Sequence, residues 1–321
     1  MRLLHVIRAR TIIGMALLAL LVSLGTTLPA MAQGQSQKAQ TQTWYVLVGY
    51  DSQNHTITGM DFLPDQIWID AGDTVVWNVY SVEPHTVSFL PPGQKAGDFN
   101  FNDPMQTQPQ GGSSYDGHSY YNSGLLAFFS PSTQYSLTFP VTGNFTYHCL
   151  IHNMMTGHVH VRSTGTPYPY TQAQYNQQAQ QRGQQLVHDG QGLVAWAKGK
   201  SDSHHVTVGV TDGDAMVMLF IPGNITVHVG DTVKFIDRTP TDDPHTVTFG
   251  PPPQEFPPVT PYGDPSHFAG QPFNSGLLGT RTNWIDQTVG NVFDVTFEQA
   301  GTYQFYCDIH GGMIINVNVL A

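Results

Sequence analysis

The sequence predicts an all-β protein of two β-sandwich domains joined by a partly helical linker. The chain has 321 residues, enough for two domains that each bury a core. It also repeats itself, because FLPDQIWIDAGDTVVW at 62–77 matches FIPGNITVHVGDTVKF at 220–235, displaced by 158 residues. Apolar and polar residues alternate at 135–139 and again at 293–297, which is the period of a half-buried strand. AGD, VGD, TGN and AGT turns separate such runs, as in an antiparallel sandwich or barrel.

The first 32 residues predict an export signal peptide and not a part of either domain. Three arginines precede an apolar run that extends from Ile12 to Leu24, and small residues follow at Ala30 and Ala32. The run is shorter than the ~20 residues that a membrane-spanning helix needs, so a retained anchor is disfavoured. No later segment is long and apolar enough either. We therefore expect a mature chain outside the cytoplasm, in the periplasm, on the cell surface or in the medium.

The charge balance excludes one class of partner. Removal of residues 1–32 leaves 9 Lys and Arg against 23 Asp and Glu, a net charge of −14. Nucleic acid is repelled by such a surface, so it is not an expected partner. Charged residues make up only 11% of the chain, which suits an exported β-protein with polar, uncharged surfaces.

The repeat sets the expected domain limits at 43–163 and 203–321, with a linker at 164–202. Within the linker, residues 171–187 are rich in Gln and Ala and poor in β-branched residues, so they can form a helix after a Pro-containing spacer. Two further segments are long, rich in Pro, Gly or Ser, and of a length that is often functional or flexible: 91–120 and 250–272.

Both cysteines of the chain stand in the frame C-x-x-H-x-x-M, once in YHCLIHNMM and once in FYCDIHGGM. In each copy another histidine lies upstream, in PHTV, 64 or 62 residues before the cysteine. The alternating segments on either side make it plausible that a distant strand brings this histidine to the cysteine loop. The candidate ligands are thus His85, Cys149, His152 and Met155 in the first half, and His245, Cys307, His310 and Met313 in the second.

Two imidazoles, a thiolate and a thioether favour copper that alternates between Cu(II) and Cu(I). Zinc remains an alternative for two histidines and a cysteine, although a thioether contributes little to it. A disulfide between the two cysteines is the other alternative for an exported chain. It leaves the repeated histidine and methionine without a reason, so we favour ligands over a bridge.

Comparison of the two copies sorts the neighbouring residues. Met154 aligns with Gly312 and so has no counterpart, whereas Met155 aligns with Met313. The histidines of the HVH sequence at 158–160 align with asparagines on an alternating strand, so we expect them to face solvent.

The paired motifs, PHTV followed by YHCLIHNMMTGHVHV and its second copy, resemble the cupredoxins, nearest to the amicyanin and plastocyanin type. The resemblance covers roughly 43–163 and 203–321. It implies a Greek-key β-sandwich in each half with one mononuclear type 1 copper at one end. It also implies that His152 and His310 lie nearest the surface as electron ports. The residue after the first histidine, commonly Asn in this family, is Thr86 or Thr246 here.

These observations favour an exported blue-copper electron carrier that serves redox proteins such as a cytochrome, an oxidase or a dehydrogenase. One alternative is a two-domain copper enzyme, of the nitrite reductase or laccase kind, which needs further histidines for a second type of copper site. His148 meets one such requirement, but Leu90 stands where another histidine is expected. A second alternative is copper buffering or delivery, which usually relies on Met-rich or His-rich tracts.

Overall fold

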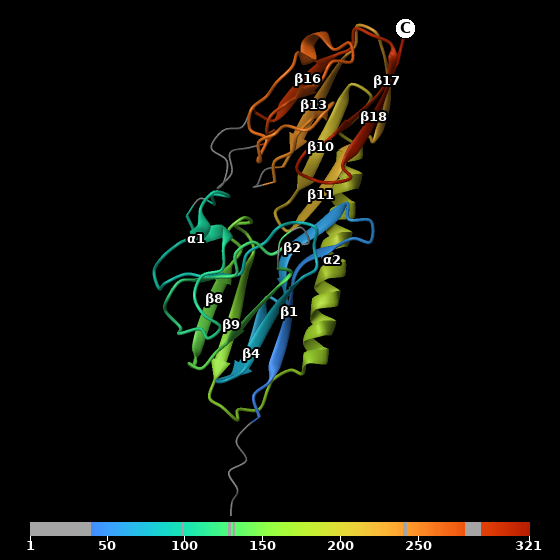
Figure 1. The fold of residues 1–321 in the computed structure, drawn as a ribbon. Helices are drawn as coiled ribbons and strands as arrows, with labels where there is room; N and C mark the ends of the chain where they lie inside the picture. Colours follow the sequence, from blue (N-terminus) through green and yellow to red (C-terminus); the bar gives the residue numbers. More distant parts are fainter. Residues whose placement is uncertain (1–39, 98, 128–129, 131, 240–242, 280–289) are drawn as a thin grey trace, which may run out of the picture. The chain divides into compact units, whose positions relative to one another are not determined.

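The structure is a computed structural model that describes residues 40–97, 99–127, 130, 132–239, 243–279 and 290–321. The expected signal peptide at 1–32 lies outside these residues. Within the described ranges, no helix combines the length and apolar character needed to cross a membrane. The fold is all-β, as predicted, with two similar sets of strands and, in the part of the chain that the structure describes, one long helix that runs along both sets (Figure 1).

The first half consists of two sheets. One contains, in spatial order, β2 (Ile57–Leu63), β1 (Thr43–Asp51), β4 (Thr74–Val79) and β7 (Gln134–Thr138). The other contains β3 (Gln66–Asp70), β9 (Thr156–Arg162), β8 (Gly143–His148), β5 (Ser88–Phe89) and β6 (Tyr121–Asn122). A short helix, α1 (Pro104–Thr107), lies in the long loop before β6.

The second half repeats this arrangement. Its first sheet runs through β11 (Ala215–Ile221), β10 (His205–Thr211), β13 (Thr232–Arg238) and β16 (Val292–Thr296). Its second sheet contains β12 (Asn224–His228), β18 (Ile314–Leu320), β17 (Gly301–Tyr306), β14 (Thr248–Phe249) and β15 (Phe273–Asn274), and a 3-10 turn, η1 (Pro265–His267), lies in a loop. The sheets are not purely antiparallel, because β1–β4 and β3–β9 pair in parallel, as do β10–β13 and β12–β18. Greek-key crossovers make such neighbours from strands that do not follow one another directly.

The two halves share a continuous sheet. Strands β2 and β11 pair antiparallel, so the first sheets of both halves join into one of eight strands (Figure 1). At the centre of this pairing Thr58 faces Met216, and these residues are equivalent in the repeat. The pairing therefore relates the two halves by a local two-fold axis.

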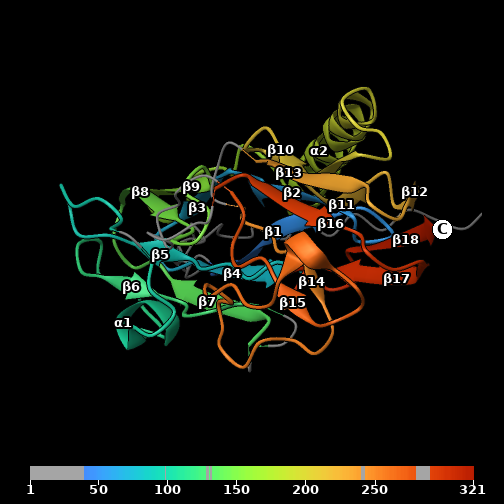
Figure 2. The same cartoon turned by 90° about the horizontal axis from the view of Figure 1, so that it is seen from above.

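The linker contains a helix, α2 (Gln172–Lys198), which confirms the helical prediction and extends it by eleven residues. Thr171 and Gln174 form a capping box at its start. Its later half contains Gly and Val, which lower helix propensity, so packing and not propensity stabilises that part. The helix contacts β1 and β2 of the first half and β10 and β11 of the second. Seen from above, it lies on the outer side of the strands (Figure 2). Helix α2 is therefore not only a spacer, because it packs against both halves and connects them.

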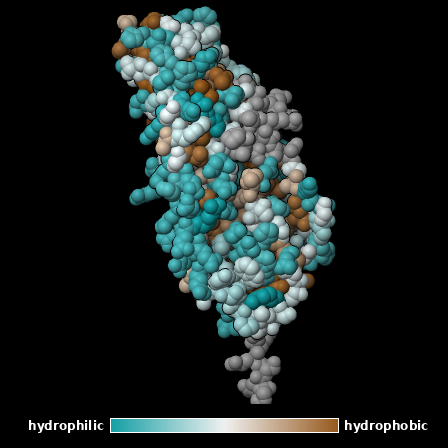
Figure 3. All heavy atoms as spheres, turned by 180° about the vertical axis from the view of Figure 1, so that it is seen from behind, coloured by the Kyte–Doolittle hydropathy of each residue, from teal (hydrophilic) through white to brown (hydrophobic). Residues whose placement is uncertain are grey.

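Each half has its own apolar core. Trp77, Phe62 and Phe139 are fully buried in the first, and Phe235 and Phe305 in the second. Met60 of β2 packs in the second half's core, which adds an apolar contact between the halves. On the face shown in Figure 3, hydrophilic residues predominate and hydrophobic ones are scattered, as is usual for a surface that meets water.

Candidate metal centres

The first candidate ligand of each half is held by backbone pairing. His85 lies in the segment between β4 and β5, where its N–H donates to the Leu126 carbonyl (2.9 Å) and its carbonyl accepts from the Leu126 N–H (2.8 Å). His245 forms the same reciprocal pair with Leu278, at 3.0 and 2.7 Å. Both imidazoles are thus fixed from a part of the chain more than sixty residues before the cysteine.

The remaining candidates lie on a short loop that follows β8 or β17. In the first half the Cys149 N–H donates to the Met155 carbonyl (3.0 Å), and the Met155 N–H donates to the His152 carbonyl (2.9 Å). The second half repeats these bonds between Cys307, Met313 and His310, at 3.0 and 3.2 Å. In both halves, the seven residues of C-x-x-H-x-x-M therefore form one loop, which a hydrogen bond between its first and last residues closes.

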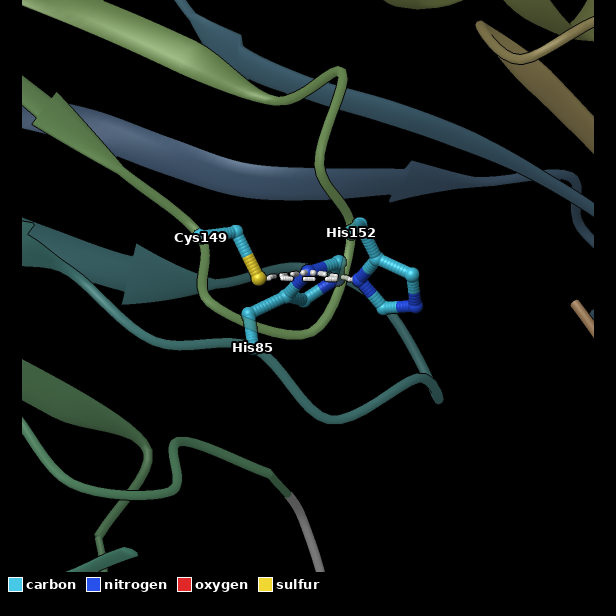
Figure 4. Close-up of side chains that lie close together, drawn as sticks. All are labelled: His85, Cys149 and His152. Carbon is cyan, nitrogen blue, oxygen red and sulfur yellow. Dashed lines mark hydrogen bonds between the residues drawn. The ribbon is translucent and has the colours of Figure 1, made fainter. Parts of the chain in front are cut away.

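Three side chains of the first half converge on one point (Figure 4). Cys149 Sγ lies 3.9 Å from His85 Nδ1 and 3.6 Å from His152 Nδ1, and the two Nδ1 atoms are 3.2 Å apart. A triangle with these sides has a circumradius of about 2.1 Å, within the roughly 2.0 to 2.3 Å of metal bonds to His and Cys. The donors are thus already arranged for a single metal ion.

The second half has almost the same triangle. Cys307 Sγ lies 3.9 Å from His245 Nδ1 and 3.6 Å from His310 Nδ1, with 2.9 Å between the two nitrogens. Its circumradius is about 2.0 Å, which also matches metal–ligand distances. Two independent copies of the same three-donor geometry argue for a metal site in each half.

Burial sets the protonation of these donors. It lowers the pKa of His85 well below its ordinary value, with a smaller effect from His152, and lowers the pKa of His152 to about 4. Burial raises the pKa of the Cys149 thiol, although N–H donors from His152 and Thr86 oppose it. The imidazoles are therefore neutral and ready to bind a metal, whereas the thiol must lose its proton when the metal enters.

A threonine ties the first histidine to the cysteine loop in both halves. The Thr86 N–H donates to Cys149 Sγ (3.4 Å), and Thr86 Oγ1 accepts from the Leu150 N–H (2.8 Å). Thr246 makes the equivalent bonds, at 3.4 Å to Cys307 Sγ and 2.8 Å from the Asp308 N–H. The departure from the usual Asn thus keeps a side chain that links the two ligand segments.

Two glycines that the metal-ligand motifs do not include make room for the first histidine of each half. Gly49 and Gly209 have φ of +72° and +71°, at bulges in β1 and β10. A Cβ would come within 2.9 Å of His85 Nε2 at the first position and 1.8 Å of His245 Nε2 at the second. The repeat contains the signal, because YVLVGYD at 45–51 matches HVTVGVT at 205–211 with a glycine at the same place in both.

The candidate methionines are buried at the end of the loop. Met155 and Met313 are each 1% exposed, whereas Met154, which has no counterpart, is 65% exposed. This fits the choice of Met155 over Met154. Ligation by the two thioethers remains a prediction, because each donor triangle involves only the two histidines and the cysteine of its half.

The alternative of a disulfide is wrong, because Cys149 and Cys307 are both free and each belongs to its own cluster. The HVH side chains lie on β9, where His158 meets Thr146 Oγ1 at 3.1 Å and His160 meets Asn144 Oδ1 at 2.7 Å. Both are partly exposed, and the Trp68 ring stacks on that of His160 with 4.5 Å between centroids.

The second cysteine loop differs from the first in charge. Asp308 follows Cys307, whereas Leu150 follows Cys149. The Asp308 carboxylate accepts from Thr248 Oγ1 (2.5 Å) and Asn274 Nδ2 (2.5 Å), and burial raises its pKa above the ordinary value despite these donors. The two sites are thus geometrically alike but electrostatically different.

His152 and His310 do not lie at the surface, contrary to what the resemblance implied. They are 7% and 4% exposed, because equivalent segments of the two halves face each other across one cavity. His310 Nε2 lies 3.7 Å from Glu83 Oε2 of the first half. Burial raises the pKa of Glu83 to about 8, helped by Asp243 and Asp51, while burial and His152 lower that of His310 to about 3. In the metal-free chain this contact therefore joins two neutral groups at pH 7.

The fold and the two donor triangles define a protein with a mononuclear soft-metal site in each of two β-sandwich halves. The sequence profile of the copper-binding proteins of the plastocyanin/azurin family matches residues 51–162 and 204–320. The chain belongs to this family. The resemblance to cupredoxins is therefore confirmed, and copper is the metal that the two sites fit, one ion per half.

The chain is also similar, over part of its length, to individual proteins. Chloroplastic plastocyanin from Fritillaria agrestis is 29% identical over 128 residues, which are 38% of this chain and 65% of that protein's length. A solved structure of amicyanin from Paracoccus versutus is 21% identical, with 37% of this chain and 81% of that chain covered and a TM-score of 0.25. A mutant amicyanin in its Cu(I) form has the same identity and TM-score, over 37% of this chain and 82% of its own.

Proposed function

We propose that the chain is an exported electron-transfer protein that holds one mononuclear type 1 copper in each half. The observation that carries the proposal is the pair of buried two-histidine, one-cysteine triangles, each about 2 Å in circumradius. Bound copper supplies a one-electron couple. The chain's own residues hold the donors at nearly fixed separations and exclude water, so little has to rearrange when the oxidation state changes.

Each residue type has a distinct role in this proposal. The Cys149 and Cys307 sulfurs would couple a bound copper ion electronically to the chain, and the two imidazoles of each half would hold it beside the sulfur. Met155 and Met313 would offer weak thioether donors to the bound ion and would help to set its reduction potential. Thr86 and Thr246 hold the cysteine loop against the first histidine. Partners are proposed to be redox proteins, such as a cytochrome, an oxidase or a dehydrogenase.

Copper loading of the purified chain tests the proposal. We expect about two copper ions per chain, an intense visible band and an EPR spectrum of type 1 copper alone. Cys149→Ser and Cys307→Ser should each remove one of the two centres. A colourless oxidised protein, or either variant with an unchanged spectrum, would refute the ligand assignment.

The matched control is His148→Gln, beside Cys149 but outside the donor triangle. A carrier keeps both type 1 signals in this variant. An additional type 2 EPR signal that disappears in His148→Gln would instead support the copper-enzyme alternative, since His148 is the residue that such a second site requires. Measured copper off-rates separate a carrier, which holds its metal tightly, from a delivery protein, which exchanges it.

A further inference from the structure

Equivalent residues of the two halves line a single cavity of about 400 Å³ between the metal sites. Its polar lining comes in matched pairs, Glu83 with Asp243 and His152 with His310, and Ile151 and Ile309 are a matched apolar pair. Most of the remaining lining is apolar. The local two-fold axis at Thr58 and Met216 explains this matching, because it turns the same end of each half toward the other.

The two cysteine-loop histidines present their outer ring edges to this cavity. In each, Nδ1 faces the cysteine sulfur at 3.6 Å, which directs Nε2 away from the donor triangle. For His310 the Nε2 atom meets Glu83 of the other half at 3.7 Å. The outer ring edge of His310, from which an electron would leave the second site, therefore contacts the first half of the same chain.

Glu83 connects this contact to the first metal site. It is separated from the ligand His85 by Pro84 alone, so the backbone links the Glu83 side chain to a donor of the first site. His85 is itself fixed by its reciprocal backbone pair with Leu126. A route from His310 to His85 thus requires one non-covalent step, and all its other links are covalent.

We infer that the two copper sites exchange electrons inside the chain through the contact between Glu83 and His310, and that this face of each site is closed to partner proteins. The inference rests on the proposed function. In each exchange one copper ion is oxidised as the other is reduced; one electron moves, and no bond or proton is transferred. The molecule is then a two-electron store whose sites equilibrate with each other.

The surroundings favour such an exchange. Glu83, His152 and His310 are each less than 8% exposed, so few water molecules need to reorient when charge moves between the sites. The two halves are held together by the β2–β11 pairing within the eight-stranded sheet and by α2, which packs against strands of both halves. A partner protein cannot approach these ring edges while the other half covers them, so outside electrons enter by another face.

NMR of the half-reduced, copper-loaded chain tests the exchange. Signals of the ligand histidines are assigned to each site from Cys149→Ser and Cys307→Ser, and their exchange broadening measures the rate. We expect the same rate at two protein concentrations that differ several-fold. Broadening that grows with protein concentration would show exchange between molecules and overturn the inference.

Two substitutions at Glu83 distinguish the effect of losing its contact with His310 from the effect of losing its carboxyl group. Glu83→Ala removes the contact and should slow the exchange several-fold, whereas Glu83→Gln spans the same distance and should keep it near the wild-type rate. Glu255→Gln, at an exposed loop carboxylate, is the control and should change nothing. An unchanged rate in Glu83→Ala would overturn the route. A fully blue protein without exchange refutes this inference alone, whereas a colourless one refutes the proposed function.

A second measurement needs no metal. Diethyl pyrocarbonate modifies accessible neutral imidazoles, and mass spectrometry locates the sites. In the metal-free chain we expect His152 and His310 to react many-fold more slowly than His118, whose side chain is 72% exposed. Reaction of both at the rate of His118 would show that the face is open and would overturn its closure.

Discussion

Helix α2 provides a quantitative test of how the two halves are held together. Its buried face includes Gly183 and Gly190, whereas Gly192 lies on the open side with nothing within 4 Å of an added Cβ. At Gly190 a Cβ would lie 2.3 Å from Ile57 Cγ2, far inside the usual contact of about 3.5 to 4.0 Å. Ile57 is 5% exposed and belongs to β2, which pairs with the second half.

The expected free energies follow from two opposing effects. Replacing a helical Gly by Ala stabilises a helix by about 1 kcal/mol, and this gain is common to positions 190 and 192. Overpacking a filled core costs about 1 to 3 kcal/mol, and only Gly190→Ala incurs it. Gly192→Ala should therefore be more stable than wild type by about 1 kcal/mol, and Gly190→Ala less stable than Gly192→Ala by about 2 kcal/mol.

Thermal unfolding of the metal-free variants, followed by circular dichroism, measures the difference. For a chain of this length, with an unfolding entropy of about 2.1 cal/mol/K per residue, 2 kcal/mol corresponds to about 3 °C in Tm. Gly183→Ala should behave like Gly190→Ala, because its Cβ would lie 2.2 Å from the Tyr50 ring. Equal Tm values for Gly190→Ala and Gly192→Ala would refute the view that α2 packs closely on β2.

Three further predictions concern the two metal sites and the contacts of α2 with both halves. Met155→Leu should raise the reduction potential of the first site only, because it removes a donor that favours Cu(II). Met154→Leu, at an exposed position, should leave that potential unchanged. If redox titration gave the same first-site potential for both variants, ligation by Met155 would be contradicted. Asp308→Asn, measured at pH 8, should raise the reduction potential of the second site, because it removes a negative charge that stabilises the oxidised ion. The first site is the internal control. An unchanged reduction potential at the second site would contradict this electrostatic effect. Arg182 contacts Asp61 of the first half and Asp214 of the second, both at 3.1 Å. Burial raises the pKa of Asp61 to about 6, so the contribution of Asp61 to stability falls as pH rises from about 4 to 6. At pH 5 most of the Asp61 carboxyl is protonated and pairs less strongly with Arg182. Arg182→Gln should therefore cost about 1 kcal/mol of unfolding free energy at pH 8 but less at pH 5. A loss independent of pH in chemical denaturation would contradict this pairing.

Local patterns were sufficient for the fold class and for four of the six side chains that converge, namely Cys149, His152, Cys307 and His310. Alternation with a period of two identifies a half-buried strand wherever it occurs, and C-x-x-H-x-x-M closes its own loop through bonds among Cys149, His152 and Met155. The upstream histidines could be selected because both copies retain them. The linker helix was foreseen only as far as its Gln- and Ala-rich part, since its continuation depends on packing against both halves.

The repeated sequence determined by itself that the chain folds twice into the same β-sandwich and offers two soft-metal donor sets, because strand periodicity and loop spacing are properties of neighbouring residues. Tertiary structure alone decided that β2 pairs with β11, that Gly49 and Gly209 admit the histidine rings, and that His310 meets Glu83. These contacts join residues far apart in sequence. Their geometry depends on how two finished sheets dock, and no periodicity within either copy encodes that docking.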